Sequence, residues 1–203
     1  YGNNEAFKIL LDAGSDKAGS DHGGGTALII AAEKGNNESL KILLDAGADK
    51  EGKSGVGRTA LMHAVMVGET GAVRILLDAG ADKEGKTNEG ESALMYAAAC
   101  GENESVKILL KYGANTEAKY NTGWSALQCA IHWGKYEACE LLITHRANVE
   151  CLEGRSNGCA VRLKERFGLT SVVDYKQHIV ERKALVHNEM YRLLVNCKPW
   201  VLC

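Results

Sequence analysis

The sequence predicts an all-α repeat solenoid, in which copies of one helix-turn-helix unit stack on one another. A hexapeptide recurs every 33 residues, as ILLDAG at 9–14, 42–47 and 75–80 and as ILLKYG at 108–113. A second string recurs with the same spacing: TALIIAA at 26–32, TALMHAV at 59–65, SALMYAA at 92–98 and SALQCAI at 125–131. A unit this small cannot bury its apolar faces alone, so its copies must stack.

The chain begins with an incomplete copy. Residues 2–14 match the second helix of the unit without a first helix, so Ala6, Ile9 and Leu10 lack their apolar partners. We therefore expect further copies ahead of Tyr1 in the natural chain. This half copy and the four full copies that follow make residues 1–146 the predicted repeat domain.

The first helix of each full copy has a recognisable start and end. A hydroxyl residue stands just before the apolar segment, as Thr26, Thr59, Ser92 and Ser125. Such a side chain accepts a hydrogen bond from an amide of the first helical turn, so we predict that these residues are N-caps. A small residue follows that allows close helix packing, as Ala31, Ala64, Ala97 and Ala130. We expect each helix to end at a glycine: Gly35, Gly68, Gly101 or Gly134.

The second helix of each copy carries apolar residues at helical spacing, such as Leu40, Leu43 and Leu44. We expect it to end at a glycine, because glycine adopts the left-handed conformation of a helix end without a Cβ clash. The glycines concerned are Gly47, Gly80 and Gly113. The fifth copy has Arg146 at this position, which should cost about 1 kcal/mol or more.

With these features the chain resembles the ankyrin repeat family, over residues 2 to about 148. The resemblance rests on the 33-residue period, the T-x-L-x-x-A segment, the glycine in mid-repeat and the L-L-x-x-G-A ending. Alanine replaces the family's usual proline after the threonine, but alanine is the best helix former, so the helix should persist. The loops resemble those of ankyrin arrays from single-celled eukaryotes, some of which are fused to protein kinase domains. The resemblance implies protruding β-hairpin loops and a concave face, formed by the first helices, that binds a partner.

The string GADKEGKS at residues 47–54 matches the phosphate-binding pattern G-x-x-x-x-G-K-[ST], and GADKEGKT at 80–87 matches it again. A working phosphate loop follows a strand and opens a helix, whose N-terminus binds the phosphates. Here the pattern follows the end of a predicted helix, and the next helix begins only at Thr59. We therefore expect no nucleotide binding at Lys53 or Lys86.

The resemblance also implies which residues face a partner. Transferring the family's variable surface positions residue by residue gives these candidates: His22, Glu33, Lys53, Val56, Arg58, Met66, Lys86, Asn88, Glu89, Glu91, Lys119, Tyr120, Asn121, Trp124 and His132. Tryptophan and tyrosine dominate interface hot spots. Trp124 is thus expected to contact the partner, although it could instead pack on its neighbouring loop. Trp133 is either a contact residue or the seal of the junction with the next segment.

After residue 146 the repeat fades. Residues 147–203 contain a degenerate sixth repeat, followed by a glycine-free and proline-free segment with one apolar stripe over residues 170–196. This pattern predicts a long helix. It either caps the end of the array, which would otherwise be apolar, or docks a partner helix or a second copy of the chain, giving self-association.

Composition excludes several classes of function. The net charge of −2 argues against a nucleic-acid partner, and the longest apolar stretch, ALMYAAAC at 93–100, is far shorter than the roughly 18 residues of a membrane span. The seven cysteines all lie beyond residue 99 without a C-x-x-C pair. They fit reduced thiols better than a disulfide framework or a zinc site, so we expect a cytoplasmic protein without metal or cofactor.

The sequence therefore predicts a non-catalytic scaffold that binds another protein through its concave face and hairpin loops. His63 and His132 lack a nucleophile or acid at a recognisable catalytic spacing. One alternative is a regulatory or targeting arm of a larger enzyme, such as an ankyrin-linked protein kinase. Another is a nucleotide hydrolase, in which Lys53→Ala and Lys86→Ala would abolish ATP binding.

Overall fold

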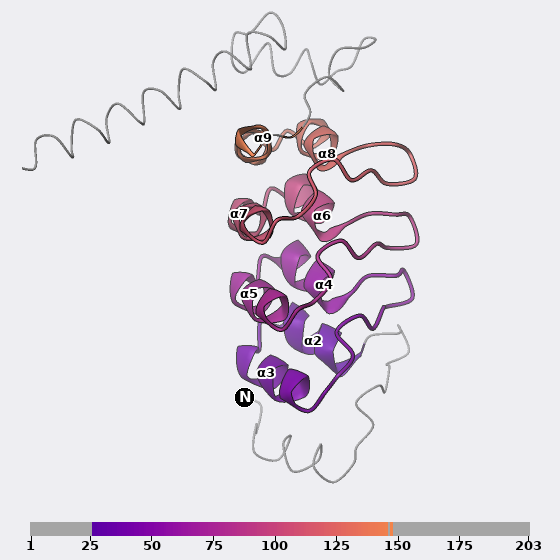
Figure 1. Ribbon diagram of the computed structural model, residues 1–203, viewed down its shortest axis with the longest axis vertical. Helices are drawn as coiled ribbons and strands as arrows, with labels where there is room; N and C mark the ends of the chain where they lie inside the picture. Colours follow the sequence, from indigo (N-terminus) through magenta and orange to yellow (C-terminus); the bar gives the residue numbers. More distant parts are fainter. Residues whose placement is uncertain (1–25, 146, 148–203) are drawn as a thin grey trace, which may run out of the picture. The chain divides into compact units, whose positions relative to one another are not determined.

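The computed structural model describes residues 26–145 and residue 147, which all belong to one compact unit ending at Asn148. The described residues form helices and turns, without a β-strand. The helices are α2 (Ala27–Glu33), α3 (Asn37–Asp45), α4 (Ala60–Val67), α5 (Thr70–Asp78), α6 (Ala93–Cys100), α7 (Asn103–Lys111), α8 (Ala126–His132) and α9 (Tyr136–Thr144). They make four helix pairs, one for each full copy of the unit (Figure 1).

The predicted N-caps are confirmed, because Thr26, Thr59, Ser92 and Ser125 are the N-cap residues of α2, α4, α6 and α8. The Oγ1 atom of Thr59 accepts a hydrogen bond of 3.4 Å from the backbone N–H of Met62. At Ser125 the backbone N–H also donates to Oε1 of Gln128, at 2.9 Å. These bonds satisfy amides that a helix start would otherwise leave without a partner.

The predicted glycine is the C-cap in two of the four first helices. Gly68 and Gly101 are left-handed C-cap residues of α4 and α6. The helices α2 and α8 end one residue earlier, so Lys34 and Trp133 are their C-caps. Among the second helices, α3 ends at Asp45, and Gly47 follows with a φ of 79°. Arg146 lies outside the described residues.

The helix pairs stack into two rows. The first helices α2, α4, α6 and α8 pack successively against one another, and so do the second helices α3, α5, α7 and α9 (Figure 1). The core lies between the rows and contains mostly leucine and alanine. Leu61, Leu94 and Leu127 are at most 1% exposed, and Ala64, Ala97 and Ala130 are fully buried. The small residues let neighbouring first helices approach closely, as the sequence predicts.

The loops between successive pairs all extend to one side of the stack (Figure 1). Each closes in a turn in which one backbone N–H donates to the carbonyl oxygen four residues later: Ser54 to Arg58 at 2.9 Å, Thr87 to Glu91 at 3.0 Å, and Tyr120 to Trp124 at 3.2 Å. An isolated antiparallel bridge joins Lys119 and Ser125. The predicted β-hairpin character of these loops stays a prediction, because no strand forms within residues 26–145.

Several predictions fall outside the described residues. These are the half copy at 2–14, the degenerate repeat after residue 147 and the helix over 170–196. Within the described part, no helix has the length and apolar character needed to cross a membrane. Cys100, Cys129 and Cys139 are free thiols there, and only the first of these three is exposed.

Candidate functional site

The loop lysines and asparagines join neighbouring turns. The Lys53 ammonium group donates a hydrogen bond of 2.8 Å to the carbonyl oxygen of Lys86, and Lys86 donates in turn to the carbonyl oxygen of Lys119 at 3.4 Å. The side-chain amide of Asn88 donates to the Gly55 carbonyl at 3.3 Å, and that of Asn121 donates to the Asn88 carbonyl at 3.4 Å. Residues predicted to face a partner thus also hold consecutive copies of the unit together.

The two strings that match the phosphate-loop pattern lie in these turns. The first string begins after α3 has ended at Asp45, and the next helix, α4, begins only at Ala60. No helix N-terminus therefore lies at Lys53 or Ser54, where a phosphate loop requires one. The ammonium group of Lys53 is instead engaged with the next turn.

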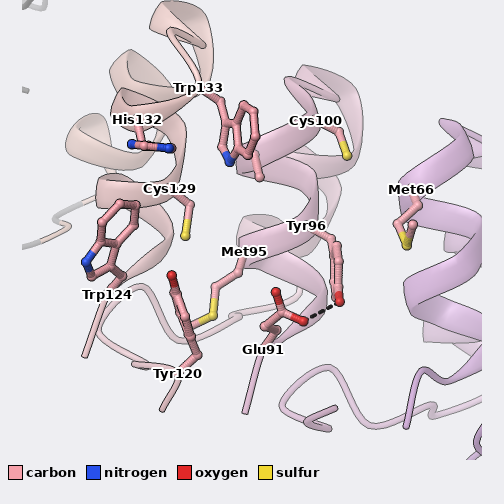
Figure 2. Close-up of a pocket in the computed structure, with 11 residues that line it drawn as sticks. Met66, Glu91, Met95, Tyr96, Cys100, Tyr120, Trp124, Cys129, His132 and Trp133 are labelled. Atoms are coloured by element: carbon pink, nitrogen blue, oxygen red, sulfur yellow. Dashed lines mark hydrogen bonds between the residues drawn. The ribbon is translucent and has the colours of Figure 1, made fainter. Parts of the chain in front are cut away.

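A groove of about 530 Å³ lies over α6 and α8. Its lining contains aromatic, sulfur-containing and small residues and one carboxylate: Met66, Glu91, Met95, Tyr96, Ala99, Cys100, Tyr120, Trp124, Cys129, His132 and Trp133. Figure 2 shows the side chains of Tyr96, Tyr120 and Trp133 around one space, with the Glu91 carboxylate at its edge. The volume falls within the roughly 300–1,000 Å³ of typical ligand sites.

The aromatic rings on the α8 side contact one another edge to face. The ring centroids of Tyr120 and Trp124 are 6.3 Å apart, those of Trp124 and His132 are 4.9 Å apart, and those of His132 and Trp133 are 5.2 Å apart. Such pairs contribute about 0.5–1.5 kcal/mol beyond their buried area. The row nevertheless remains open to solvent, because the residue Trp133 is 63% exposed.

Glu91 and Tyr96 form a polar pair on the α6 side. The Tyr96 hydroxyl donates a hydrogen bond to Oε2 of Glu91, and it accepts one of 3.1 Å from Nε of Arg58. The Arg58 guanidinium also lies over the Tyr96 ring, 5.1 Å from its centroid. Burial, followed by the hydrogen bond to Glu91, raises the pKa of Tyr96, so its hydroxyl stays protonated.

Met95 and Cys129 are the buried members of the lining, at 3% and 7% exposure. Burial and the nearby charge of Glu91 raise the pKa of Cys129 to about 11. The thiol is therefore protonated at neutral pH, and it contributes an uncharged sulfur surface to the groove.

Glu33 and His63 form a second polar pair, from α2 and α4. Nδ1 of His63 lies 3.7 Å from Oε2 of Glu33, while Nε2 is buried without a hydrogen-bond partner among the described residues. Burial lowers the pKa of His63, the charge of Glu33 opposes this shift, and the charge of Arg58 adds to it. Neither a nucleophilic hydroxyl nor a thiol is hydrogen-bonded to this imidazole within the described part.

The structure brings together five of the predicted partner-binding residues in the groove: Met66, Glu91, Tyr120, Trp124 and His132. Nine others lie elsewhere on α2 and the turns: Glu33, Lys53, Val56, Arg58, Lys86, Asn88, Glu89, Lys119 and Asn121. His22 is outside the described residues. Val56 is 53% exposed at the tip of its turn.

Sequence reasoning missed Met95, Tyr96, Cys100 and Cys129 as lining residues. One signal was present for three of them. Tyr96 and Cys129 occupy the same position of the unit as Ile30 and His63, and Cys100 occupies the position of Lys34, Val67 and Trp133. The residues at these positions differ from copy to copy, whereas neighbouring core positions hold the same or similar residues in every copy. Such variation is typical of surface positions. The position of Met95 also differs between copies, with Ile29, Met62 and Gln128, but three of its four residues are apolar, as at a core position.

The described residues include no group of three or more His, Cys, Asp or Glu side chains that could hold a metal ion. A comparison with curated proteins finds no match to the chain. The family model described as ankyrin repeats (3 copies) matches residues 1–87 and again residues 80–153. Ankyrin repeats generally serve as protein–protein interaction modules. The 33-residue units, their paired helices and this match over most of the chain show that the protein belongs to the ankyrin repeat family.

Proposed function

We propose that this protein binds a partner protein through the groove over α6 and α8 and the turns beside it, and that it catalyses no reaction of its own. One observation carries the proposal. Residues 26–147 contain six Tyr and Trp residues, of which four line the groove: Tyr96, Tyr120, Trp124 and Trp133.

The position of these rings favours recognition over stability. The buried hydrophobic core of the described residues contains no aromatic side chain, so the fold does not use these rings to fill its interior. Clustered exposed aromatic residues are the usual centres of protein interfaces, since they bury a large area and lose little conformational entropy. An aromatic cluster on one groove therefore supports a binding surface.

The surrounding structure supports rigid presentation of this surface. Both walls belong to helices that are packed in the stack, and Tyr120 and Trp124 lie on a turn that Asn121 and Lys86 tie to its neighbour. A partner would therefore meet a preformed surface, which lowers the entropy cost of binding. We infer that hairpin loops of the array extend the contact, and that the protein acts in the cytoplasm, where its thiols stay reduced.

The test is a capture experiment with the whole chain as bait. Bait with the original sequence is compared with a Tyr120→Ala/Trp124→Ala variant and with a Tyr112→Ala/Tyr136→Ala control, which removes aromatic surface outside the groove. Circular dichroism checks that each bait is folded. A protein retained by the original and the control, and lost with the groove variant, is then purified, and its Kd for all three is measured by calorimetry.

Equal Kd values for the original bait and the groove variant would overturn the proposed site. We expect the groove variant to weaken binding by at least ~2 kcal/mol, as loss of hot-spot aromatic residues does.

A further inference from the structure

The electrostatics of the groove points to the chemistry of its partner. Among the described residues, Glu91 is the one acidic residue in the lining, and no lysine or arginine lines the groove. Within the described part of the chain, Glu91 takes part in no ion pair. Its carboxylate accepts hydrogen bonds from two neutral hydroxyl groups, those of Thr87 and Tyr96. The Arg58 guanidinium joins this network only through Tyr96, to whose hydroxyl it donates.

These two hydrogen bonds leave one oxygen for a further donor. Thr87 Oγ1, at 3.2 Å, and the Tyr96 hydroxyl both donate to Oε2 of Glu91. In the part of the chain that the structure describes, Oε1 accepts from neither. A carboxylate held in one orientation at the edge of an apolar groove favours a charged donor, because few water molecules compete there.

The aromatic walls favour the same ligand charge. The faces of tyrosine and tryptophan rings carry negative electrostatic potential, and they attract ammonium and guanidinium groups. The chain itself provides an example at the rim of the groove, where the Arg58 guanidinium lies 5.1 Å from the Tyr96 ring centroid. Arg58 is not part of the groove lining, so this contact does not fill the groove.

We propose that the groove receives an arginine side chain from a protein partner, with its guanidinium directed at Glu91 and stacked on the rings of Tyr120 and Trp133. This inference rests on the proposed function and specifies the partner by its charge. Arginine is favoured over lysine because its planar group stacks on aromatic faces while its N–H groups bond a carboxylate. Met95 and Cys129 form an uncharged part of the groove lining, and this part fits the apolar stem of such a side chain.

A random seven-residue peptide library displayed on phage tests the proposal. It is selected in parallel on the whole original chain, on Glu91→Gln, on Tyr120→Ala/Trp124→Ala and on Glu38→Gln. Glu91→Gln keeps the size and the acceptor oxygen but removes the charge. Glu38→Gln removes the same charge from the exposed start of α3, in the row of second helices.

We expect peptides with arginine at one fixed position to be enriched on the original chain and on Glu38→Gln. The same peptides should be lost on the other two variants. The best peptide is then synthesised with citrulline, the uncharged analogue of arginine, at that position. Its Kd should rise by roughly tenfold on the original chain and much less on Glu91→Gln.

Peptides that depend on Tyr120 and Trp124 but lack an enriched arginine would overturn this inference and leave the proposed function standing. Enrichment of lysine equal to that of arginine would overturn the assignment of a planar guanidinium. Peptides that bind the Tyr120→Ala/Trp124→Ala variant as well as the original chain would count against both the inference and the proposed binding surface. A failure to enrich any peptide would do the same.

Discussion

The side chain of Lys53 bonds the backbone of Lys86, its counterpart in the next copy of the unit, with 2.8 Å between Nζ and the carbonyl oxygen. Lys86 repeats the contact with Lys119 at 3.4 Å. The lysine of the pattern that resembles a phosphate loop thus couples successive turns of the stack. Two predictions follow from this relationship, one for stability and one for nucleotide binding.

Lys53→Met should lower the free energy of unfolding by about 0.5–1.5 kcal/mol, because it removes a hydrogen bond between copies. Because Lys53 is exposed, we expect a loss at the lower end of this range. The measurement is a urea titration followed by circular dichroism. Lys41→Met, on the exposed face of α3, is the matched control and should change the midpoint much less. Identical losses for the two variants would show that the contact contributes nothing to stability.

ATP should not bind to the original chain, because α4 begins only at Ala60 and offers no helix N-terminus to a phosphate at Lys53. Isothermal titration calorimetry with ATP and magnesium measures this directly. Heat of ATP binding that is measured with the original chain and disappears in Lys53→Ala would contradict the purely structural role of Lys53. It would instead support a nucleotide-binding site. Lys41→Ala is the control for a general loss of positive charge.

Gly57→Ala should destabilise the protein more than Gly47→Ala. Both glycines have positive φ, 82° and 79°, so alanine pays a similar left-handed penalty of roughly 1–2 kcal/mol at either position. A Cβ at Gly47 meets nothing within 4 Å, whereas one at Gly57 would lie 2.7 Å from the backbone nitrogen of Asn88. The additional loss should be about 1 kcal/mol or more, measured by urea unfolding. Equal losses of unfolding free energy in Gly57→Ala and Gly47→Ala would mean that the turns containing Gly57 and Asn88 can move apart without an energetic cost.

Acid should destabilise the protein partly through His63. Burial lowers its pKa in the folded state below the ordinary value of 6.5, so the unfolded chain binds the proton more readily. This contribution to stability is complete above pH 6.5 and is lost as the pH falls from there through the lower folded-state pKa. Urea unfolding of the original chain and of His63→Gln, between about pH 7.5 and pH 5, isolates the effect.

The charge of Glu33 should limit how much stability the protein loses in acid through His63. Since Glu33 raises the pKa of His63, Glu33→Gln should lower it further and deepen the loss of stability in acid. A histidine NMR titration measures the pKa in both proteins. An unchanged or higher pKa of His63 in Glu33→Gln would show that the 3.7 Å contact has no electrostatic effect.

Cys129 should resist alkylation by iodoacetamide in the folded protein. With a pKa of about 11, only ~0.1% of this thiol is the reactive thiolate at pH 8, and the residue is 7% exposed. Mass spectrometry of the peptide that contains Cys129 measures the rate, and the urea-unfolded chain provides the reference. Glu91→Gln should increase the folded-state rate, because the Glu91 charge contributes to the raised pKa. Equal rates in folded and unfolded protein would contradict the assignment.

The helices and their order could be predicted because their signals are local. A hydroxyl residue before an apolar run predicted Thr59 and Ser125 as N-caps, and both are N-caps. The 33-residue period predicted that successive copies stack, and α6 packs on α8. Backbone geometry within a few residues decides where a helix begins, and the repeat period is visible in the sequence itself, so a single sequence contains both signals.

The groove could be predicted only in part. Trp124 and Tyr120 were expected at a partner surface from their repeat positions, and both line the groove. Tyr96 and Cys129 were missed, although the alignment of copies marks their position as variable. Their place in the lining depends on how side chains from neighbouring copies fill the space between α6 and α8, and the sequence does not state those rotamers.

The sequence by itself determined the family, the repeat length and the starts of the first helices, since these depend on short motifs and on their recurrence along the chain. Only the tertiary structure decided that Lys53 bonds the next turn and that Glu91, within residues 26–145, lies among aromatic rings without an ionic partner. The physical reason is that both facts depend on the spacing and rotation between stacked copies. That geometry results from packing over the whole core and is not encoded in any one unit.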